Sequence, residues 1–417
     1  MPKLQKEDEK ICRYPCYRTN PCHQRAILHY VCTNLCALTD SFQIIAKTLT
    51  GFEEILASEL QEMGIKTEQL ARAVRFHGDQ EILYRVNYCS RLALRFLKYI
   101  ASFQVHKQED LYIRIKDLPW EQYMTGSQTF AVDAVINKSV FSNSLFVAQK
   151  AKDAIADRFR TIYGKRPSVD LKNPDLRINI HLNKEQCSVS LDSSGSSLHK
   201  RGYRQRTWEA PLSEVLAAGL IQLAGWDQQT PLYDPMCGSG TIPMEAAMLA
   251  SNTPAGYFRR EFGLMKWNDF DASLWAKIKA DADGRIQPVT VPVRGTDKSR
   301  QAIHSAKINI QKTHLGKSVQ LTVSNFHATK PPFEVGLMIM NPPYDERIGL
   351  DDVIAFYRSL GDALKQLYTG WQAWIISSDM KALKFLGLKP SRKIPLFNGP
   401  LECRFARFDL YEGSRKN

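Results

Sequence analysis

The sequence predicts an α/β protein whose C-terminal half is a Rossmann-like domain with a mostly parallel sheet, preceded by an α+β region. Two observations predict the C-terminal domain. A short apolar strand at 231–234 leads into a glycine-containing turn and a helix-forming segment at 241–250, the order found in doubly wound nucleotide-binding folds. Near the C-terminus, Asn398-Gly399 separates two apolar runs, which predicts an antiparallel hairpin that ends the sheet.

The other elements of the C-terminal half continue the alternation of strands and helices. Valines at every second position predict a strand at 289–297, and a further strand is expected at 319–323. An amphipathic helix is predicted for 351–368 and a buried strand for 371–376. Residues 251–288 interrupt the pattern, and we expect them to form a helical elaboration on the surface. With the hairpin, these elements predict a seven-stranded sheet.

The N-terminal half has a different order of elements. Residues 42–87 follow a strand, helix, strand, helix pattern that is typical of a ferredoxin-like unit. An alternating strand at 129–136, a helix at 143–163 and a strand at 176–182 come next. Because 417 residues exceed one ordinary hydrophobic core, two or three domains are expected.

The charge balance points to a polyanionic partner. Lysine and arginine outnumber the acids, giving a formal net charge of +13, and a basic surface favours nucleic acid. The alternative is a basic surface that serves only solubility. No apolar run is long enough to span a membrane, and no apolar signal core stands at the start. A cytoplasmic protein is therefore expected.

Five of the nine cysteines lie before residue 40, at Cys12, Cys16, Cys22, Cys32 and Cys36. The paired C-x-x-C spacing of zinc sites is absent, so we predict no metal site here, with a zinc or iron–sulfur centre as the alternative. The segment is expected to be a disordered extension, or upstream sequence translated from a misassigned start.

The turn after the first C-terminal strand indicates which nucleotide it binds. Gly238 and Gly240 permit a tight turn. Pro243 stands where the dinucleotide fingerprint needs a small residue, and no Gly-Lys-Ser/Thr is present. Asp234 is unfavourable beside a pyrophosphate but suits the ammonium group of a methionine moiety. The loop therefore favours S-adenosylmethionine over NAD or ATP.

Three further residues are candidates for the same ligand. Asp297 ends the second strand, where an acid binds ribose hydroxyls in this fold class. Asn325 and Phe326 follow the third strand and could bracket an adenine, although Asn325 could equally be a turn residue. Cys237 invites a nucleophile hypothesis, as in pyrimidine C5 methylation. Because it lies inside the cofactor turn, we interpret it as a small packing residue.

The run Asn341-Pro342-Pro343-Tyr344 follows the apolar strand 337–340 and predicts methyl transfer to a planar nitrogen. The lone pair of an exocyclic amine is delocalised, so the amine is a poor nucleophile. An asparagine oxygen and a carbonyl next to a proline can accept its N–H bonds and direct the lone pair towards an electrophile. Consecutive prolines keep the turn rigid, and Tyr344 could stack on a flipped base. The alternative is an ordinary Asn-Pro turn.

Positive and aromatic residues alternate in the segment between the two halves, which spans 198–208. Such a composition can stack bases and neutralise phosphates together. We therefore predict contact with RNA, rather than a merely solvated linker, for a set of five residues: Lys200, Arg201, Tyr203, Arg204 and Arg206.

These motifs carry a family resemblance. Residues 200–204 and 210–214, the 234–241 loop and the Asn-Pro-Pro-Tyr run resemble those of bacterial 23S rRNA guanine-N2 methyltransferases. The resemblance implies a Rossmann-like class I methyltransferase domain that holds S-adenosyl-L-methionine in the loop and the guanine amine at Asn341 to Tyr344. The candidate cofactor-binding set is Asp234, Pro235, Cys237, Gly238, Ser239, Gly240, Thr241, Asp297, Lys298, Asn325 and Phe326.

The N-terminal half resembles the THUMP RNA-binding module with its ferredoxin-like partner, over about 41–198. The expected domains are an extension at 1–40, a ferredoxin-like domain at 41–105, a THUMP domain at 106–198 and the methyltransferase domain at 199–417. An rRNA substrate is preferred. The alternatives are a tRNA guanine-N2 methyltransferase, an adenine-N6 methyltransferase and a non-catalytic RNA-binding assembly factor.

Overall fold

The computed structural model describes residues 41–206, 211–311, 313–343 and 350–412. The chain divides into two units, Met1–Ser41 and Phe42–Asn417, and the description below concerns the second. The predicted extension at 1–40, with its cysteines, lies outside the described residues, as do Trp208 of the linker and Tyr344.

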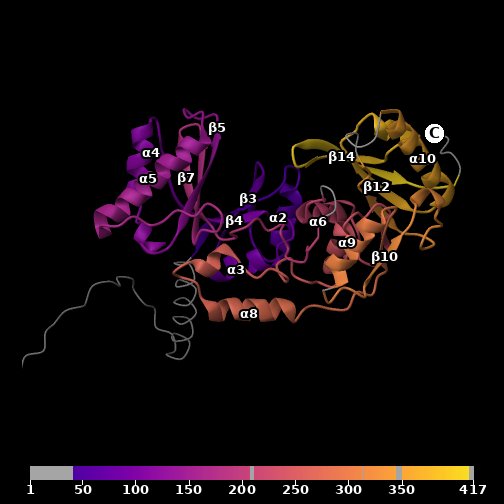
Figure 1. The fold of residues 1–417 in the computed structure, drawn as a ribbon, viewed down its shortest axis with the longest axis horizontal. Helices are drawn as coiled ribbons and strands as arrows, with labels where there is room; N and C mark the ends of the chain where they lie inside the picture. The colour runs from indigo at the N-terminus through magenta and orange to yellow at the C-terminus, as the bar shows by residue number, and fades with distance from the viewer. Residues whose placement is uncertain (1–40, 207–210, 312, 344–349, 413–417) are drawn as a thin grey trace, which may run out of the picture. The chain divides into compact units, whose positions relative to one another are not determined.

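The N-terminal half forms one seven-stranded sheet (Figure 1). Its strands are, in spatial order, β2 (Thr67–Leu70), β3 (Ala73–Gly78), β1 (Phe42–Lys47), β4 (Arg95–Gln104), β7 (Gln186–Asp192), β6 (Leu176–Asn183) and β5 (Phe130–Asn137). All neighbours are antiparallel except β5 and β6. Since β4 pairs with β7, the boundary predicted at 105/106 falls within one continuous sheet.

Four helices accompany this sheet: α2 (Glu53–Glu62), α3 (Gln80–Cys89), α4 (Gln108–Asp117) and α5 (Ser144–Tyr163). The predicted strands and helices at 42–87, 129–136, 143–163 and 176–182 are all confirmed to within a few residues at their ends. Our prediction missed β2, β4, α4 and β7.

The C-terminal half contains the predicted seven-stranded sheet. Its strands are, in spatial order, β10 (Val319–Val323), β9 (Val293–Asp297), β8 (Leu232–Asp234), β11 (Leu337–Met340), β12 (Gln372–Ser377), β14 (Leu401–Asp409) and β13 (Arg392–Asn398). The first five are parallel, and β14 is antiparallel to both of its neighbours, which confirms the predicted hairpin. The strand order reverses between β8 and β11, where such sheets bind ligands.

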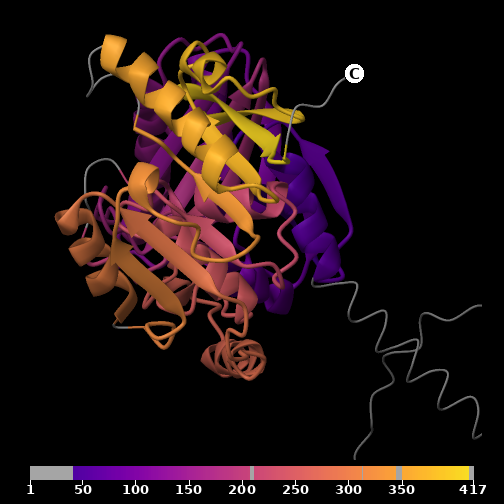
Figure 2. The same ribbon diagram turned by 90° about the vertical axis from the view of Figure 1, so that its right-hand side faces the viewer.

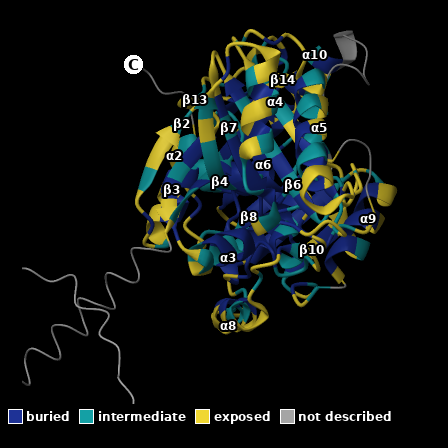
Figure 3. Ribbon diagram, turned by 90° about the vertical axis from the view of Figure 1, so that its left-hand side faces the viewer, coloured by how far each residue is buried: buried dark blue, intermediate teal, exposed yellow. Residues whose placement is uncertain are grey.

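Helices cover both faces of this sheet. The helices α6 (Glu214–Leu223), α7 (Thr241–Ala250) and α9 (Arg300–Gln311) share a hydrophobic cluster with Ile339 of β11, whereas α10 (Leu350–Leu367) shares another with Met338 and Met340. Successive strand residues thus alternate between the two faces. Figure 2 shows α10 along one face, and β8 lies in the buried interior in Figure 3. No helix in the described ranges is both long and apolar enough to cross a membrane.

The segment 251–288 contains a helix, as predicted, but much of it is irregular, and it is more than a surface elaboration. It contains α8 (Ala272–Asp283), whose Trp275 is buried and contacts the rings of Tyr84 and Tyr88 edge-on. Both tyrosines belong to α3 of the N-terminal half. The Tyr88 hydroxyl also donates to Asp283 at 2.6 Å. The segment therefore joins the C-terminal half to the N-terminal half.

A second junction depends on a glycine. Gly219 of α6 lies against the buried ring of Phe52, and a Cβ at this position would overlap the ring. Gly219→Ala should therefore lower the free energy of unfolding by about 1–3 kcal/mol, although alanine is the better helix former. Chemical denaturation measures the change. Gly126→Ala is the matched control, because its Cβ would meet only Phe159, at 3.9 Å. Equal unfolding midpoints for the two variants would contradict this packing.

Candidate functional site

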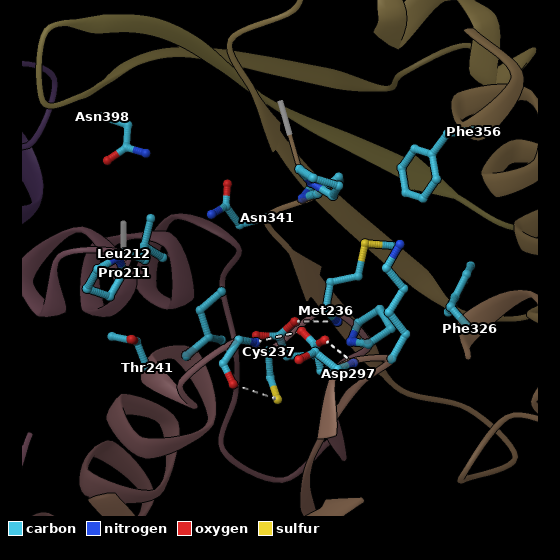
Figure 4. A pocket seen from close by; sticks show the side chains of 18 of the residues that line it. Pro211, Leu212, Met236, Cys237, Thr241, Asp297, Phe326, Asn341, Phe356 and Asn398 are labelled. Carbon is cyan, nitrogen blue, oxygen red and sulfur yellow. Dashed lines mark hydrogen bonds between the residues drawn. The ribbon is translucent and has the colours of Figure 1, made fainter. Parts of the chain in front are cut away.

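A cavity of about 1150 Å³ lies at the carboxyl ends of β8, β9, β10 and β11 (Figure 4). It brings together the two motifs that are far apart in the sequence. The predicted site residues that line it are Asp234, Pro235, Cys237, Gly238, Ser239, Thr241, Asp297, Lys298, Asn325, Phe326, Asn341, Pro342 and Pro343. Of the remaining predicted residues, Gly240 is the N-cap of α7.

The loop after β8 has the backbone that its glycines predict. Gly238 and Gly240 have φ values of +54° and +84°, which L side chains rarely adopt. A Cβ at Gly240 would also lie 3.1 Å from the Cβ of Ala306 in α9. The turn therefore brings the first residues of α7 to the cavity, where Thr241 and Ile242 line the wall.

Two carboxylates converge in this loop. Asp234 is only 2 % exposed, and burial raises its pKa well above the usual range, with the negative charge of Asp297 acting in the same direction. The Met236 N–H donates to Asp234 at 3.1 Å and opposes that shift. Within the described ranges, no cation pairs with Asp234. A cationic ligand would stabilise the ionised form, so the site fits the ammonium group of S-adenosylmethionine.

Asp297 is held by the backbone on both sides. It accepts from the Gly238 N–H at 3.0 Å and from the Ser299 N–H at 2.8 Å. Its carboxylate thus joins the end of β9 to the loop after β8. This position at the cavity wall is the one that the sequence predicts for an acid that binds ribose.

Both expected adenine residues, Asn325 and Phe326, line the cavity, and Phe326 lies across it from Thr241 in Figure 4. Phe326 stacks on Tyr368 with a centroid distance of 4.9 Å and an interplanar angle of 12°. Asn325 accepts from the His327 N–H at 3.2 Å and caps the short helix that begins at Phe326. Asn325 is thus the turn residue that we considered, and it lines the cavity as well.

Cys237 is a packing residue in this structure. Its side chain is buried, and a Cβ at Gly295 would lie 3.1 Å from the Cβ of Cys237. Burial raises the pKa of the thiol well above its ordinary value, and the charges of Asp234 and Asp297 add to the shift. The thiol is therefore neutral at physiological pH, which argues against a nucleophile.

Asn341 follows the last residue of β11, and its side chain lies near the middle of the cavity in Figure 4. Further parts of the lining come from elements that our sequence analysis did not assign to the site. These lining residues are Pro211 and Leu212, Phe356 of α10, Ser378 to Lys381 after β12, and Asn398, Leu401 and Glu402 of the hairpin.

The linker between the halves requires a correction. Arg201 and Tyr203 are 1 % and 4 % exposed, and both contact Glu245 of α7, at 3.5 and 3.1 Å. Arg204 is half-buried and paired with Glu214 at 2.8 Å. The RNA contacts predicted for the buried Arg201 and Tyr203 are therefore wrong, whereas the Arg204 guanidinium has an internal partner in Glu214. Lys200 and Arg206 are exposed.

Comparison with known protein families gives three matches along the chain. The RMKL-like methyltransferase domain matches residues 201–407. The THUMP domain matches residues 106–192, and the RlmL ferredoxin-like domain matches residues 43–97. Each match lies inside one of the domains expected from the sequence.

Curated relatives cover most of the chain. A "Putative RNA methyltransferase" of Synechocystis sp. is 39% identical over 88% of this chain and 96% of its own. Two proteins named ribosomal RNA large subunit methyltransferase K/L, from Syntrophotalea carbinolica and Psychromonas ingrahamii, are 37% and 39% identical over 87% and 85% of this chain. The match covers 53% and 48% of their lengths, so the chain spans about half of these K/L proteins.

Solved structures share the fold. SMU.472, described as "a putative methyltransferase complexed with SAH", has a TM-score of 0.80 and 29% identity over 90% of this chain and 100% of its own. A "possible methylase from Clostridium difficile 630" has the same TM-score and coverage with 30% identity. The chain therefore belongs to the THUMP-containing, RMKL-like methyltransferase family, whose cofactor is S-adenosyl-L-methionine.

Proposed function

We propose that this protein transfers the methyl group of S-adenosyl-L-methionine to the exocyclic N2 amine of a guanine in 23S rRNA. Relatives at 37–39% identity are named as methyltransferases of the large ribosomal subunit RNA, and the THUMP match supports an RNA substrate. The choice of guanine N2 follows the family resemblance of the four motifs. Acting on ribosomal RNA, the protein would work in the cytoplasm.

The observation that carries this proposal is the shared cavity. Asn341 and Pro342 line the same space as Asp234 and Asp297. The bound cofactor supplies an electrophilic methyl group on a sulfonium. The Asn341 side-chain oxygen, together with a carbonyl of the Pro-Pro turn, accepts the N–H bonds of the amine and directs its lone pair into the cavity. As the new C–N bond forms, the methyl–sulfur bond of the sulfonium breaks and S-adenosylhomocysteine would leave. The methylated nitrogen is acidic and loses its proton to solvent, so no charged base is required beside it.

On this proposal, residues of the same cavity bind the cofactor. Asp234 receives the ammonium group, Asp297 the ribose hydroxyls, and Asn325 with Phe326 the adenine. Lys298, Pro235 and the 237–241 loop complete the wall. Tyr344, outside the described residues, keeps its expected role as a stacking surface for the flipped base.

On this proposal, the N-terminal half and exposed cations of the linker between the two halves bind the RNA. Lys200 and Arg206 are the linker residues that remain available. The net charge of +13 supports a long polyanionic ligand.

One comparison favours a second candidate function. A structure described as a "predicted N6-adenine-specific DNA methylase" from Listeria monocytogenes is 28% identical with a TM-score of 0.80. Methylation of adenine N6 uses the same Asn-Pro-Pro-Tyr chemistry. The THUMP match favours RNA over DNA for this chain.

Nucleoside mass spectrometry of separated 23S rRNA, 16S rRNA and tRNA from a deletion strain tests the proposal. We expect N2-methylguanosine to fall in the 23S fraction only, and the wild-type gene to restore it. A loss confined to tRNA would move the substrate to tRNA, and a loss of N6-methyladenosine would favour the second candidate. No change in any modified nucleoside would overturn the enzymatic proposal.

A further inference from the structure

Arg204 makes an unusual set of contacts that substrate binding does not explain. Its Nε donates to the Glu214 carboxylate at 2.8 Å. One terminal nitrogen donates to the Ser239 hydroxyl at 2.8 Å, and the other donates to the Thr241 hydroxyl at 2.9 Å and to the Leu212 carbonyl at 3.2 Å. The planar guanidinium therefore spans the start of α6 and the loop that precedes α7.

Two of these partners belong to the proposed cofactor site. Ser239 and Thr241 both line the cavity. Each hydroxyl oxygen accepts a hydrogen bond from a cation, so its own hydrogen must point away from Arg204 and can donate to another group. Charge-assisted bonds of this kind are about twice as strong as neutral ones. Arg204 thus fixes how the two hydroxyls are presented.

The burial of the ion pair indicates positioning rather than stability. The side chains of Arg204 and Glu214 are 14% and 6% exposed. Removing such a pair from water costs about as much as its attraction returns, so its net contribution to folding is small. The pair instead fixes the orientation of the Arg204 guanidinium next to the loop that precedes α7.

A second side chain holds the same segment from the other side. Asn309 of α9 is buried; its side-chain oxygen accepts from the backbone N–H groups of Gln205 at 2.8 Å and Arg206 at 3.0 Å. Its amide nitrogen donates to the carbonyls of Arg206 at 2.9 Å and Ser239 at 3.3 Å. Residues 204–206 are therefore fixed next to the 238–241 loop, and Ser239 is hydrogen-bonded at both its side chain and its carbonyl.

We propose that Arg204 is a positioning residue for cofactor binding, acting through Ser239 and Thr241. The hydroxyls that it orients, beside the N-terminal turn of α7, suit the carboxylate of the methionine moiety, whose ammonium group lies at Asp234. This inference rests on the proposed function, because it requires that the cofactor occupies this cavity.

Calorimetric titration of S-adenosylhomocysteine into the full chain tests the role. Arg204→Lys keeps a positive charge for Glu214, but one ammonium group cannot reproduce the fork that reaches three partners. We expect the dissociation constant to rise about 10- to 100-fold, as is typical when a partner behind a binding group is lost, with little change in the thermal midpoint. If the lysine variant does not fold, Arg204→Gln combined with Glu214→Gln leaves no unpaired buried charge, and should show the same loss of affinity.

Arg259→Lys is the matched control. The Arg259 guanidinium also binds the linker, through the carbonyl of Lys200, and the residues just before it, through the carbonyls of Ser194 and Ser197, at 2.9–3.1 Å. It bonds to no cavity residue. It should leave the affinity unchanged. An equal loss in both variants would mean general loosening of the linker and would overturn the proposal.

The cavity variant Asp234→Asn separates the role of Arg204 from the assignment of the cavity to the cofactor. If Arg204→Lys binds like the wild type whereas Asp234→Asn does not, the role of Arg204 is overturned and the cofactor cavity stands. If the wild type does not bind S-adenosylhomocysteine, or Asp234→Asn leaves binding unchanged, the cavity assignment fails and the role of Arg204 fails with it.

Discussion

Replacing Asn341 with alanine is expected to lower the rate of methyl transfer severely while cofactor binding persists. The side chain lies near the middle of the cavity, at the end of β11, and on our proposal it accepts an N–H bond of the target amine. Removing one preorganised hydrogen-bonding group of this kind lowers kcat by roughly 10²–10³-fold. The cofactor residues on β8 and β9 are untouched, so the affinity for S-adenosylhomocysteine should match the wild type.

Transfer of labelled methyl groups to 23S rRNA from the deletion strain measures this effect. Asn341→Asp provides a graded comparison, because a carboxylate oxygen still accepts an N–H bond and should retain part of the rate. Asn268→Ala replaces an exposed asparagine of the 251–288 segment and should leave the rate unchanged. If Asn341→Ala transfers methyl groups at the wild-type rate, the tetrapeptide is not the amine site.

The conformation of the 234–241 loop could be predicted because its signals are local. The strand and helix expected at 231–234 and 241–250 correspond to β8 and α7, and both loop glycines have the positive φ that makes glycine necessary there. The C-terminal hairpin was predictable for the same reason. Turn chemistry depends on neighbouring residues and needs no knowledge of the remaining fold.

The linker could not be predicted because its partners are distant in sequence. Its composition is that of a nucleic-acid contact, yet Arg201 and Tyr203 are buried against Glu245. One clue was present. Glu245 is the only charged residue in the otherwise apolar helix Thr241–Ala250, and an acid in a buried helix needs a cation. Nothing local indicates which of several arginines provides it.

The residues that the hairpin contributes to the cavity could not be predicted for the same reason. The sequence predicts the hairpin, but its residues Asn398 and Leu401 reach the cavity only because β14 inserts between β12 and β13. The pairing of β4 with β7 in the N-terminal half is also non-local. Strand order is set by such tertiary contacts, which alternation along a single strand does not reveal.

Asp234→Asn is expected to change cofactor affinity and stability in opposite directions. On our proposal, the carboxylate binds the ammonium group of the cofactor, and a hydrogen bond to a charged group is worth about 1.5–3 kcal/mol. Its loss should weaken binding of S-adenosylhomocysteine about 10- to 100-fold. In the free protein, however, the amide carries no charge that must be buried. The thermal midpoint of the variant should therefore equal or exceed that of the wild type, whereas exposed Asp281→Asn should change neither quantity.

The pH dependence of both quantities gives the decisive test. Burial raises the folded-state pKa of Asp234 above the unfolded value of about 3.9. The stability that this group contributes is therefore fully present below that unfolded pKa, and it is lost as the pH rises through the folded-state pKa. The stability advantage of Asp234→Asn should grow over this pH range. A cation binds only the ionised carboxylate, so wild-type affinity should fall on acidification and binding should release a proton, as calorimetry in buffers of different ionisation enthalpy can detect. If the variant shows the same proton release as the wild type, Asp234 does not receive the ammonium group.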